Sequence, residues 1–401
     1  MSRKVELLSP AGNLDKLKLA FLYGADAVYI GGKDYSLRAN AKNFSVEEIK
    51  EACDFAHNLN KKVYVTVNIV FHNEDVEGLV DYLKDLERCK VDAIIITDLF
   101  IIDLIKENNI NLNIHISTQN SSLNIESVEY LKSLGVERVV LARESSKVNI
   151  KEIIDKTGME IECFVHGAMC ASISGRCVLS NYFTNRDANR GGCAQVCRWE
   201  FDLCDSNKNV ITEDIKFAMA PKDLCMIDCL KDMIDIGICS LKVEGRMRSD
   251  YYIATVINTY REAIDDYYSN NLTIDRIDYY SRILKRVSNR DNISQFFNRF
   301  PDSKEQYYLG RQEISNQDFL GVVIDYDKEK KEVTLMQRNY FKKGDKVEIF
   351  GPNIKTFSFV IPEIYDEDYN LLEVANHPTQ IIKFKLDTGV FKDDIMRIKI
   401  Q

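Results

Sequence analysis

The feature that most constrains the fold is a repeated alternation between short apolar runs and longer segments with helical periodicity. Strands alternating with helices of this length indicate parallel β–α units, and eight units predict a closed (β/α)8 TIM-like barrel. The alternative is a doubly wound open sheet, but no Gly-rich dinucleotide fingerprint follows the first run. The apolar runs are Val5–Leu8, Ala27–Ile30, Val63–Val67, Ala93–Thr97, Ile114–Ser117, Arg138–Leu141, Ile161–Val165 and Ser240–Val243.

Polar residues gather where the last two predicted strands end. In a barrel of this type, catalytic side chains lie at the carboxyl ends of the strands. His166 follows the seventh run, whereas Lys242, Glu244 and Arg246 lie within or just after the eighth. Arg246 offers a planar fork that suits a carboxylate or phosphate ligand. The alternative for this trio is a salt-bridge network that closes the barrel.

A long cysteine-rich insertion, residues 167–237, follows the seventh predicted strand and greatly exceeds an ordinary loop. Cys170, Cys177, Cys193 and Cys197 lie in its glycine-rich first half. Thiolates are the ligands of iron–sulfur clusters and of structural zinc, so these four predict one metal centre. The chain has 11 cysteines in total, and most of the others lie on predicted strands or helices, where buried thiols are common.

The spacing of these cysteines helps to distinguish a zinc ion from an iron–sulfur cluster. Cys193 and Cys197 are separated by three residues, as in a zinc knuckle, but six residues separate Cys170 from Cys177. The wide spacing modestly favours a 4Fe–4S cluster over zinc, which stays as the alternative. A Cys–His nucleophile pair between His166 and a nearby cysteine is a third reading, but no third member of a triad is evident.

Basic and aromatic residues are distributed along the first half of the same insertion. Arginine beside aromatic rings can hold phosphates and stack bases, which predicts contact with RNA. The alternative is that the arginines pair with Asp187, Glu200 or the charge of the metal centre. The arginines are Arg176, Arg186, Arg190 and Arg198, and the aromatic residues are Tyr182, Phe183 and Trp199.

Composition limits the remaining possibilities. The net charge of −9 argues against non-specific nucleic-acid binding through bulk charge, although a local basic groove is compatible with it. No apolar run is long enough to cross a bilayer, and the first residues lack the apolar core of a signal peptide, so we expect a cytoplasmic protein without a membrane partner. The expected domains are a barrel over 1–270, a helical linker over 271–306 and a small β-barrel domain over 307–401, where short strands alternate with turn signals.

The segment Glu162-Cys-Phe-Val-His-Gly167-Ala-Met-Cys170, followed by Gly175-Arg-Cys177, resembles the signature of the collagenase-like peptidase family U-32. The family name implies proteolysis. Better understood members similar to this chain carry a 4Fe–4S cluster and hydroxylate, without oxygen, the wobble uridine of tRNA, a ribosomal cytidine or a ubiquinone precursor. The RNA enzymes depend on prephenate, and the ubiquinone members work as pairs of related chains.

The resemblance implies that Cys170, Cys177, Cys193 and Cys197 hold the cluster. The sequence therefore predicts an iron–sulfur RNA hydroxylase that forms 5-hydroxyuridine in tRNA, with prephenate as co-substrate, an unidentified electron donor and a related partner chain. The alternatives are a peptidase and a zinc-stabilised RNA-binding or assembly factor without catalytic activity. We expect proton transfer by Glu244 and His166, and phosphate or carboxylate contacts from Arg190, Arg198, Arg246 and Lys242.

Overall fold

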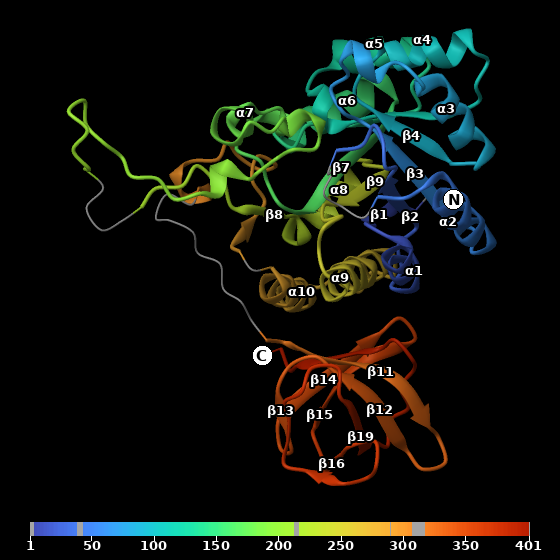
Figure 1. Ribbon diagram of the computed structural model, residues 1–401, viewed down its shortest axis with the longest axis vertical. Helices are drawn as coiled ribbons and strands as arrows, with labels where there is room; N and C mark the ends of the chain where they lie inside the picture. Colours follow the sequence, from blue (N-terminus) through green and yellow to red (C-terminus); the bar gives the residue numbers. More distant parts are fainter. Residues whose placement is uncertain (1–3, 38–42, 212–215, 289, 307–316, 401) are drawn as a thin grey trace.

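Eight parallel strands form a closed barrel in the computed structural model (Figure 1), which describes residues 4–37, 43–211, 216–288, 290–306 and 317–400. The last strand of the barrel pairs in parallel with both the first and the seventh, so the sheet closes on itself. The predicted (β/α)8 barrel is thereby confirmed. The strands are β1 (Glu6–Pro10), β2 (Ala27–Gly31), β3 (Lys62–Val67), β4 (Ala93–Ile96), β5 (Ile114–Ile116), β6 (Arg138–Val140), β7 (Glu160–Gly167) and β9 (Ser240–Val243).

Helices cover the outside of the barrel, and local sequence signals explain where they begin. Asn13, Asn124 and Ser146 each accept a hydrogen bond from the backbone N–H three residues later, and Ser45 forms a complete capping box with Glu48. The helices are α1 (Leu14–Leu22), α2 (Val46–Asn58), α3 (Leu79–Arg88), α4 (Phe100–Glu107), α5 (Ile125–Ser133), α6 (Lys147–Thr157), α8 (Leu230–Asp235) and α9 (Asp250–Tyr268).

A network of charged side chains lies inside the barrel. Arg138 donates from Nη1 to Glu6 Oε1 at 2.6 Å and to Glu162 Oε2 at 3.2 Å, and Lys242 Nζ lies 2.8 Å from Glu162 Oε1. Tyr64 donates its hydroxyl to the other Glu6 oxygen at 2.7 Å. Burial would raise the pKa of Glu162, but the neighbouring Lys242 and Arg138 lower it overall. Each buried charge in this network therefore has a partner of opposite sign.

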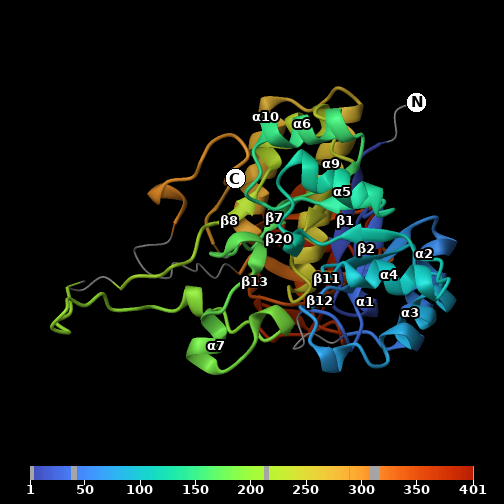
Figure 2. The ribbon, with the colours of Figure 1, turned by 90° about the horizontal axis from the view of Figure 1, so that it is seen from above.

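The cysteine-rich insertion leaves the barrel at Gly167, as predicted. The backbone there has φ +117, and a Cβ atom would lie 2.7 Å from Glu244 Cβ, so only glycine fits between β7 and the chain after β9. The insertion contains α7 (Leu179–Thr184) and returns through β8 (Asp223–Cys225), which pairs antiparallel with the end of β7. The ribbon over residues 200–211 extends away from the barrel (Figures 1 and 2).

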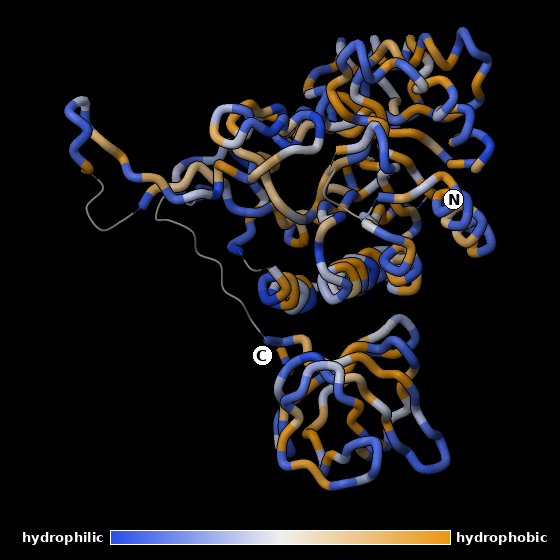
Figure 3. Tube along the Cα trace, viewed as in Figure 1, coloured by the Kyte–Doolittle hydropathy of each residue, from blue (hydrophilic) through white to orange (hydrophobic). Residues whose placement is uncertain are grey.

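The segment 271–306, expected as a helical linker, contains α10 (Ile274–Val287) and the two-residue strand β10 (Asn292–Ile293), which pairs with β8. Hydrophobic and hydrophilic residues alternate along α9 and α10 (Figure 3). The apolar side of α10, including Tyr280 and Leu284, belongs to the same buried cluster as the barrel helices. This helix is thus packed into the barrel domain.

The C-terminal part is an antiparallel β-sheet domain, which confirms the expected β class, although residues 307–316 at its expected start lie outside the described residues. It contacts the barrel through a stacked pair, Tyr251 and Phe319, whose ring centroids are 4.8 Å apart. No helix in the described part of the chain is long and apolar enough to span a bilayer. The strands are β11 (Phe319–Asp327), β12 (Glu332–Gln337), β13 (Phe341–Lys342), β14 (Lys346–Gly351), β15 (Ile354–Val360), β16 (Ile364–Tyr365), β17 (Leu371–Leu372), β18 (Val374–Ala375), β19 (Ile381–Lys385) and β20 (Ile395–Ile398).

Candidate active site

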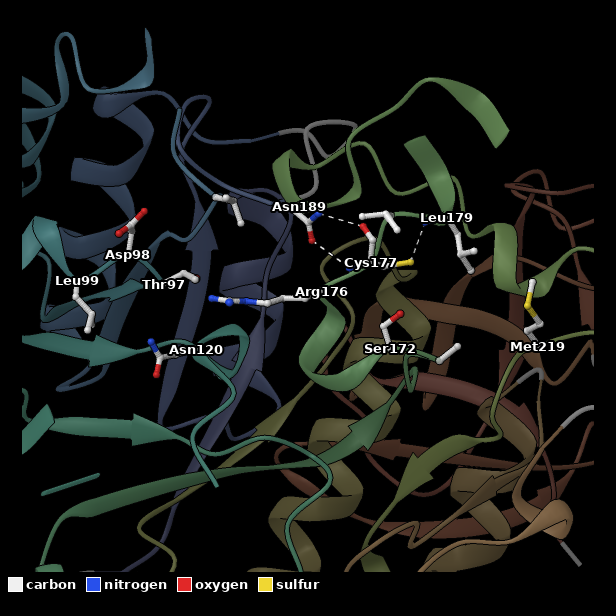
Figure 4. A pocket seen from close by; sticks show the side chains of 13 residues that line it. Thr97, Asp98, Leu99, Asn120, Ser172, Arg176, Cys177, Leu179, Asn189 and Met219 are labelled. Atoms are coloured by element: carbon white, nitrogen blue, oxygen red, sulfur yellow. Dashed lines mark hydrogen bonds between the residues drawn. The ribbon is translucent and has the colours of Figure 1, made fainter. Parts of the chain in front are cut away.

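A pocket of about 960 Å³ lies between the carboxyl ends of the barrel strands and the insertion (Figure 4). Its position agrees with the place where barrels of this class carry their chemistry. Arg176 extends from the insertion, with its guanidinium directed toward the barrel wall. The barrel supplies Val70, Thr97, Asp98, Leu99 and Asn120, and the insertion supplies Ala171, Ser172, Arg176, Cys177, Val178, Leu179, Asn189 and Met219.

Asn189 fixes the backbone of the cysteine that lines this pocket. Its side-chain oxygen accepts from Cys177 N at 3.2 Å, and its amide nitrogen donates to Cys177 O at 3.0 Å. The carbonyl of Asn189 in turn accepts from Val70 N at 3.0 Å, which ties the insertion to the loop after β3. One asparagine therefore positions Cys177 relative to the barrel.

Two side chains at the end of β6 hold the first turn of the insertion. Glu144 accepts from Ser174 N at 3.1 Å, and Arg143 donates to the carbonyl of Ala168. The Arg143 guanidinium also lies 3.5 Å from Glu244 Oε2. Glu244, a predicted catalytic residue, therefore lies beside the base of the insertion, where a charged partner orients its carboxylate.

All four predicted metal-binding cysteines carry free thiols. Two of these sulfurs accept backbone hydrogen bonds, Cys170 from Ser172 N and Cys177 from Leu179 N, both at 3.4 Å. Burial raises the pKa of Cys197, and the charges of Cys170, Cys193 and Cys177 raise it further. Hydrogen bonds from Ala194 N to Ser180 Oγ at 3.1 Å and from Arg198 Nη2 to Met169 O at 3.4 Å join the segments that carry the four cysteines.

The donor set at this place fits an iron–sulfur cluster or a zinc ion. Backbone N–H groups point at two of the four sulfurs, and a cationic centre would relieve the mutual repulsion of thiolates brought together around it. Within the described residues, however, no group of three or more His, Cys, Asp or Glu side chains forms a closed metal site. The side chains that would hold the group are Cys170, Cys177, Cys193 and Cys197, after a reorientation of their thiols.

His166 lies below the rim, with only 1% of its surface exposed. Its ring contacts Tyr252 and Tyr260, its Nε2 lies 3.5 Å from Ser288 Oγ, and its Nδ1 has no hydrogen-bond partner among the described residues. Burial lowers the pKa of His166 to about 4, only partly opposed by Asp223. The imidazole is therefore neutral at pH 7, and it is not among the side chains that line the pocket.

Two of the predicted substrate-binding residues are buried in the barrel. Lys242 is engaged by Glu162, as described above, and Arg246 donates to Ser36 Oγ at 2.9 Å. A Cβ atom at Gly31 would lie 1.8 Å from Arg246 Nη1, so the arginine fits only because residue 31 is glycine. Neither basic side chain lines the pocket, and both stabilise the barrel wall.

The other two predicted substrate-binding residues lie on the insertion and are paired. Arg190 forms a bidentate pair with Asp75, its Nη2 lying 2.8 Å from Oδ1. Arg198 donates to Asp223 Oδ1 at 3.3 Å and to Met169 O at 3.4 Å. In the free protein Arg190 therefore fastens the insertion to the loop after β3, whereas Arg198 joins two parts of the insertion itself.

Two pocket residues, Asp98 and Arg176, were not among the site residues chosen from the sequence, although Arg176 was one of the arginines expected to contact RNA. Neither has a hydrogen-bond or ion-pair partner among the residues that the structure describes. They approach the pocket from opposite walls, so they offer it one positive and one negative charge. The available signal was positional, because Asp98 follows β4 at the rim and Arg176 directly precedes Cys177.

Comparison with known families covers nearly the whole chain. The model described as "Peptidase family U32" matches residues 12–307, and the model of the "Peptidase family U32 C-terminal domain" matches residues 315–397. The chain belongs to peptidase family U32. The resemblance noted in the sequence is confirmed, and the matched U32 span includes both the insertion and α10.

Several relatives of this U32 chain have names that point to RNA. It is 48% identical over 404 residues to "tRNA hydroxylation protein P1" of Bacillus subtilis (strain 168), covering 99% of this chain and 95% of that one. It is 37% identical over 264 residues to "23S rRNA 5-hydroxycytidine C2501 synthase" of Escherichia coli (strain K12), covering 66% of this chain and 40% of that one. It is also 30% identical over 395 residues to a "Collagenase" of Porphyromonas gingivalis (strain ATCC BAA-308 / W83), covering 92% and 91%.

Proposed function

We propose that this U32 protein hydroxylates a pyrimidine of RNA, with the wobble uridine of tRNA as substrate and 5-hydroxyuridine as product, in an oxygen-independent reaction that requires an iron–sulfur centre. The observation that carries the proposal is the pocket of about 960 Å³ whose insertion wall contains Cys177 and Arg176. The full-length relationship to a protein named for tRNA hydroxylation supports the choice of RNA.

The pocket has the size and polarity to receive one base taken out of a loop. Bases of a single-stranded loop can be splayed out with little unstacking cost, and an enzyme then reads their edges with polar side chains. Asp98 can accept the N3–H of uracil, and the amide of Asn120 can donate to a carbonyl oxygen. Arg176 supplies a fork for a phosphate, or for a carboxylate of an oxygen donor such as prephenate.

Replacing hydrogen by hydroxyl at C5 of uracil requires removal of a proton from that carbon. In this proposal Glu244, which lies beside the base of the insertion and outside the residues that line the pocket, accepts the proton, and Arg143, 3.5 Å away, holds the carboxylate in place. His166 acts as a neutral, buried group, because burial lowers its pKa to about 4. The four cysteines would hold the iron–sulfur centre, which when bound supplies electron-transfer chemistry next to the pocket.

The proposal places the protein in the cytoplasm, with tRNA as its partner. Replacing C–H by C–OH removes two electrons from the base, and in this proposal the oxygen donor takes them up. An electron donor that primes the iron–sulfur centre and a related U32 chain are candidate partners. Nothing in the proposal requires proteolysis.

Nucleoside analysis tests the reaction. We expect tRNA from a strain lacking this gene to lose 5-hydroxyuridine and its derivatives by mass spectrometry, and the intact gene to restore them. A Cys177→Ser variant should fail to restore them, whereas Cys53→Ser, a change at a buried thiol of α2, should succeed. Unchanged 5-hydroxyuridine derivatives in a strain without a paralogue would contradict the tRNA assignment.

Metal analysis tests the centre. After anaerobic purification we expect about four iron and four sulfide per chain and a broad absorption band of a 4Fe–4S cluster. One zinc per chain, with no iron, would contradict the cluster and favour a zinc-stabilised RNA-binding factor. Cleavage of gelatin by colourless protein that depends on Cys170 would favour a peptidase instead.

A further inference from the structure

A group of aromatic side chains on the insertion is unusually exposed. We call Tyr182, Phe183 and Trp199 the aromatic face, and these side chains are 84%, 52% and 42% exposed. The rings of Phe183 and Trp199 lie 6.1 Å apart between centroids in an edge-to-face arrangement. Single exposed apolar residues are ordinary, but a gathering of large rings beside a pocket marks a surface that another molecule covers.

Packing within the insertion accounts for only part of the aromatic face. Phe183 packs against Phe201, with centroids 5.6 Å apart, and Phe201 pairs through its backbone with Phe217 at the base of the protruding ribbon. This explains why Phe183 is held in place. It does not explain Tyr182, which leaves most of its surface in water.

The surroundings of the aromatic face are basic, although the chain as a whole carries a net charge of −9. Four arginines and a single acidic residue, Asp187, lie between Gly167 and Trp199. A hollow of about 290 Å³ beside Trp199 is lined by Arg186 and Arg198. Arg186 is exposed and has no ion-pair partner in the part of the chain that the structure describes, so its charge is available to an outside anion.

This combination fits RNA better than a protein partner. The centres of protein interfaces are depleted of charged residues, whereas single-stranded nucleic acids are held by arginines and by rings on which bases stack. The aromatic face is also close to the pocket in the fold, because Leu179 lines the pocket from the same short helix, α7, that carries Tyr182 and Phe183. A strand whose base enters the pocket would pass over α7.

We propose that the aromatic face binds the single-stranded nucleotides that flank the base in the pocket, with one base stacked on Trp199 and a phosphate on Arg186. The inference rests on the proposed function for the identity of the ligand, and it deepens that function by naming the surface that selects unpaired RNA. Double-stranded RNA offers no free base faces for the rings, so the face favours loops over duplexes.

Trp199 is the only tryptophan of the chain, so its fluorescence reports on this surface alone. The experiment titrates the full-length protein with an RNA stem–loop that has a single-stranded loop, and with a fully paired duplex of equal length. We expect quenching of tryptophan emission by the stem–loop and little change with the duplex. Binding of the stem–loop, measured by anisotropy of a label on the RNA, without any change in tryptophan emission would overturn the proposal.

Variants give a second readout. Trp199→Ala and Tyr182→Ala should each weaken binding of the stem–loop about tenfold, whereas Trp199→Phe should retain most of the affinity. Tyr130→Ala is the matched control, because Tyr130 on α5 is 58% exposed and far in sequence from the insertion. Arg186→Ala should lower the slope of log affinity against log salt by about 0.7, the value for one phosphate of a single strand. Equal affinities and slopes in all variants would overturn the proposal.

The test separates this inference from the proposed reaction. If the aromatic face binds RNA but no hydroxylated base forms, the proposed function fails and the surface stands. If hydroxylation proceeds while the aromatic variants bind the stem–loop like the wild type, the surface assignment fails alone. Self-association of the chain that is abolished by Tyr182→Ala, without an effect on RNA binding, would identify a protein interface and would also overturn the inference.

Discussion

The charged side chains inside the barrel and those on the insertion differ in what they contact. Within the barrel, Arg138 and Lys242 bond to Glu6 and Glu162. On the insertion, the exposed guanidinium of Arg176 reaches into the pocket without a partner among the described residues. A buried charge needs an opposite charge to offset its desolvation, whereas an exposed arginine does not. The first group therefore maintains the barrel, and the second is available to a ligand.

The same comparison separates the basic residues proposed from the sequence as substrate contacts. Lys242 and Arg246 belong with the barrel interior, because their donors are directed to Glu162 and to Ser36. Arg190 and Arg198 lie between the two groups, being on the insertion but paired with Asp75 and Asp223. Arg176 is the arginine whose guanidinium is directed into the pocket.

The largest effect is expected inside the barrel. Arg138→Met should lower the free energy of unfolding by about 3–5 kcal/mol, because Glu6 and Glu162 would remain buried without the guanidinium that offsets their charge. Urea denaturation measures this change. Arg88→Met is the control, since Arg88 is 73% exposed on α3, and its loss should change the stability by less than about 0.5 kcal/mol. A stability of Arg138→Met equal to that of the control would show that the interior charges are dispensable.

His166 should make the stability depend on pH. Its folded-state pKa is lowered to about 4 from a usual value near 6.5, so below pH 6.5 the unfolded chain binds a proton that the folded chain excludes. Stability from this group is therefore complete above pH 6.5 and is lost as the pH falls toward 4, by about 3 kcal/mol in total.

Denaturation curves at a series of pH values test this expectation. His166→Gln should show a shallower loss of stability between pH 6.5 and 4 than the wild type. His72→Gln, at an exposed position in the loop after β3, should leave the slope of the wild type. Equal slopes in both variants would mean that His166 titrates in the folded protein, as an accessible catalytic acid would.

The sequence predicted the barrel well because apolar runs and helical periodicity are local signals. The predicted run Ser240–Val243 coincides with β9, and Ala27–Ile30 differs from β2 by a single residue. The three-residue strand β8 (Asp223–Cys225) was not predicted, because its pairing with the end of β7 is set by the return path of the insertion. The amphipathic α10 was interpreted as a linker, since its charged outer side dominates its composition.

The candidate site was harder to predict, because it depends on which way side chains point. Lys242 lies in a strand, where successive side chains point to opposite faces of the sheet. An error of one residue in the predicted register therefore decides whether its side chain is placed inside or outside the barrel. The charges of Glu6 and Glu162 in the two neighbouring strands, and of Arg138 in the strand beyond β7, were a signal that Lys242 faces inward. Arg176 and Asp98 line the same pocket although one lies in a loop and the other at a distant strand end, and no local pattern encodes that arrangement.

The substitution Arg176→Ala tests whether the guanidinium in the pocket serves a ligand and not the fold. We expect RNA hydroxylation to fall about 10- to 100-fold, because the pocket loses its anion contact, while the free energy of unfolding changes by less than about 0.5 kcal/mol. Arg176→Lys should recover only part of the activity, because an ammonium lacks the bidentate fork. Steady-state rates and urea denaturation on the same preparations measure both quantities. If Arg176→Ala lowered the free energy of unfolding as much as Arg138→Met, the charges on the insertion would be as structural as those inside the barrel.

The smallest effect is expected at the intermediate pair, Asp75 and Arg190. Burial raises the pKa of Asp75, but the hydrogen bonds from Arg190 and from the backbone of His72, together with the charge of Arg190, lower it overall. The pair therefore stabilises the fold at pH 7 and loses this contribution as the pH falls through the folded-state pKa. A double-mutant cycle with Asp75→Asn and Arg190→Gln should give a coupling of about 0.5–1 kcal/mol at pH 7. If Arg190→Gln also weakened binding of the RNA stem–loop as much as Arg186→Ala, an ion pair in the free protein would not preclude a ligand contact. The division between structural and ligand-binding arginines would then have to be drawn by exposure rather than by pairing.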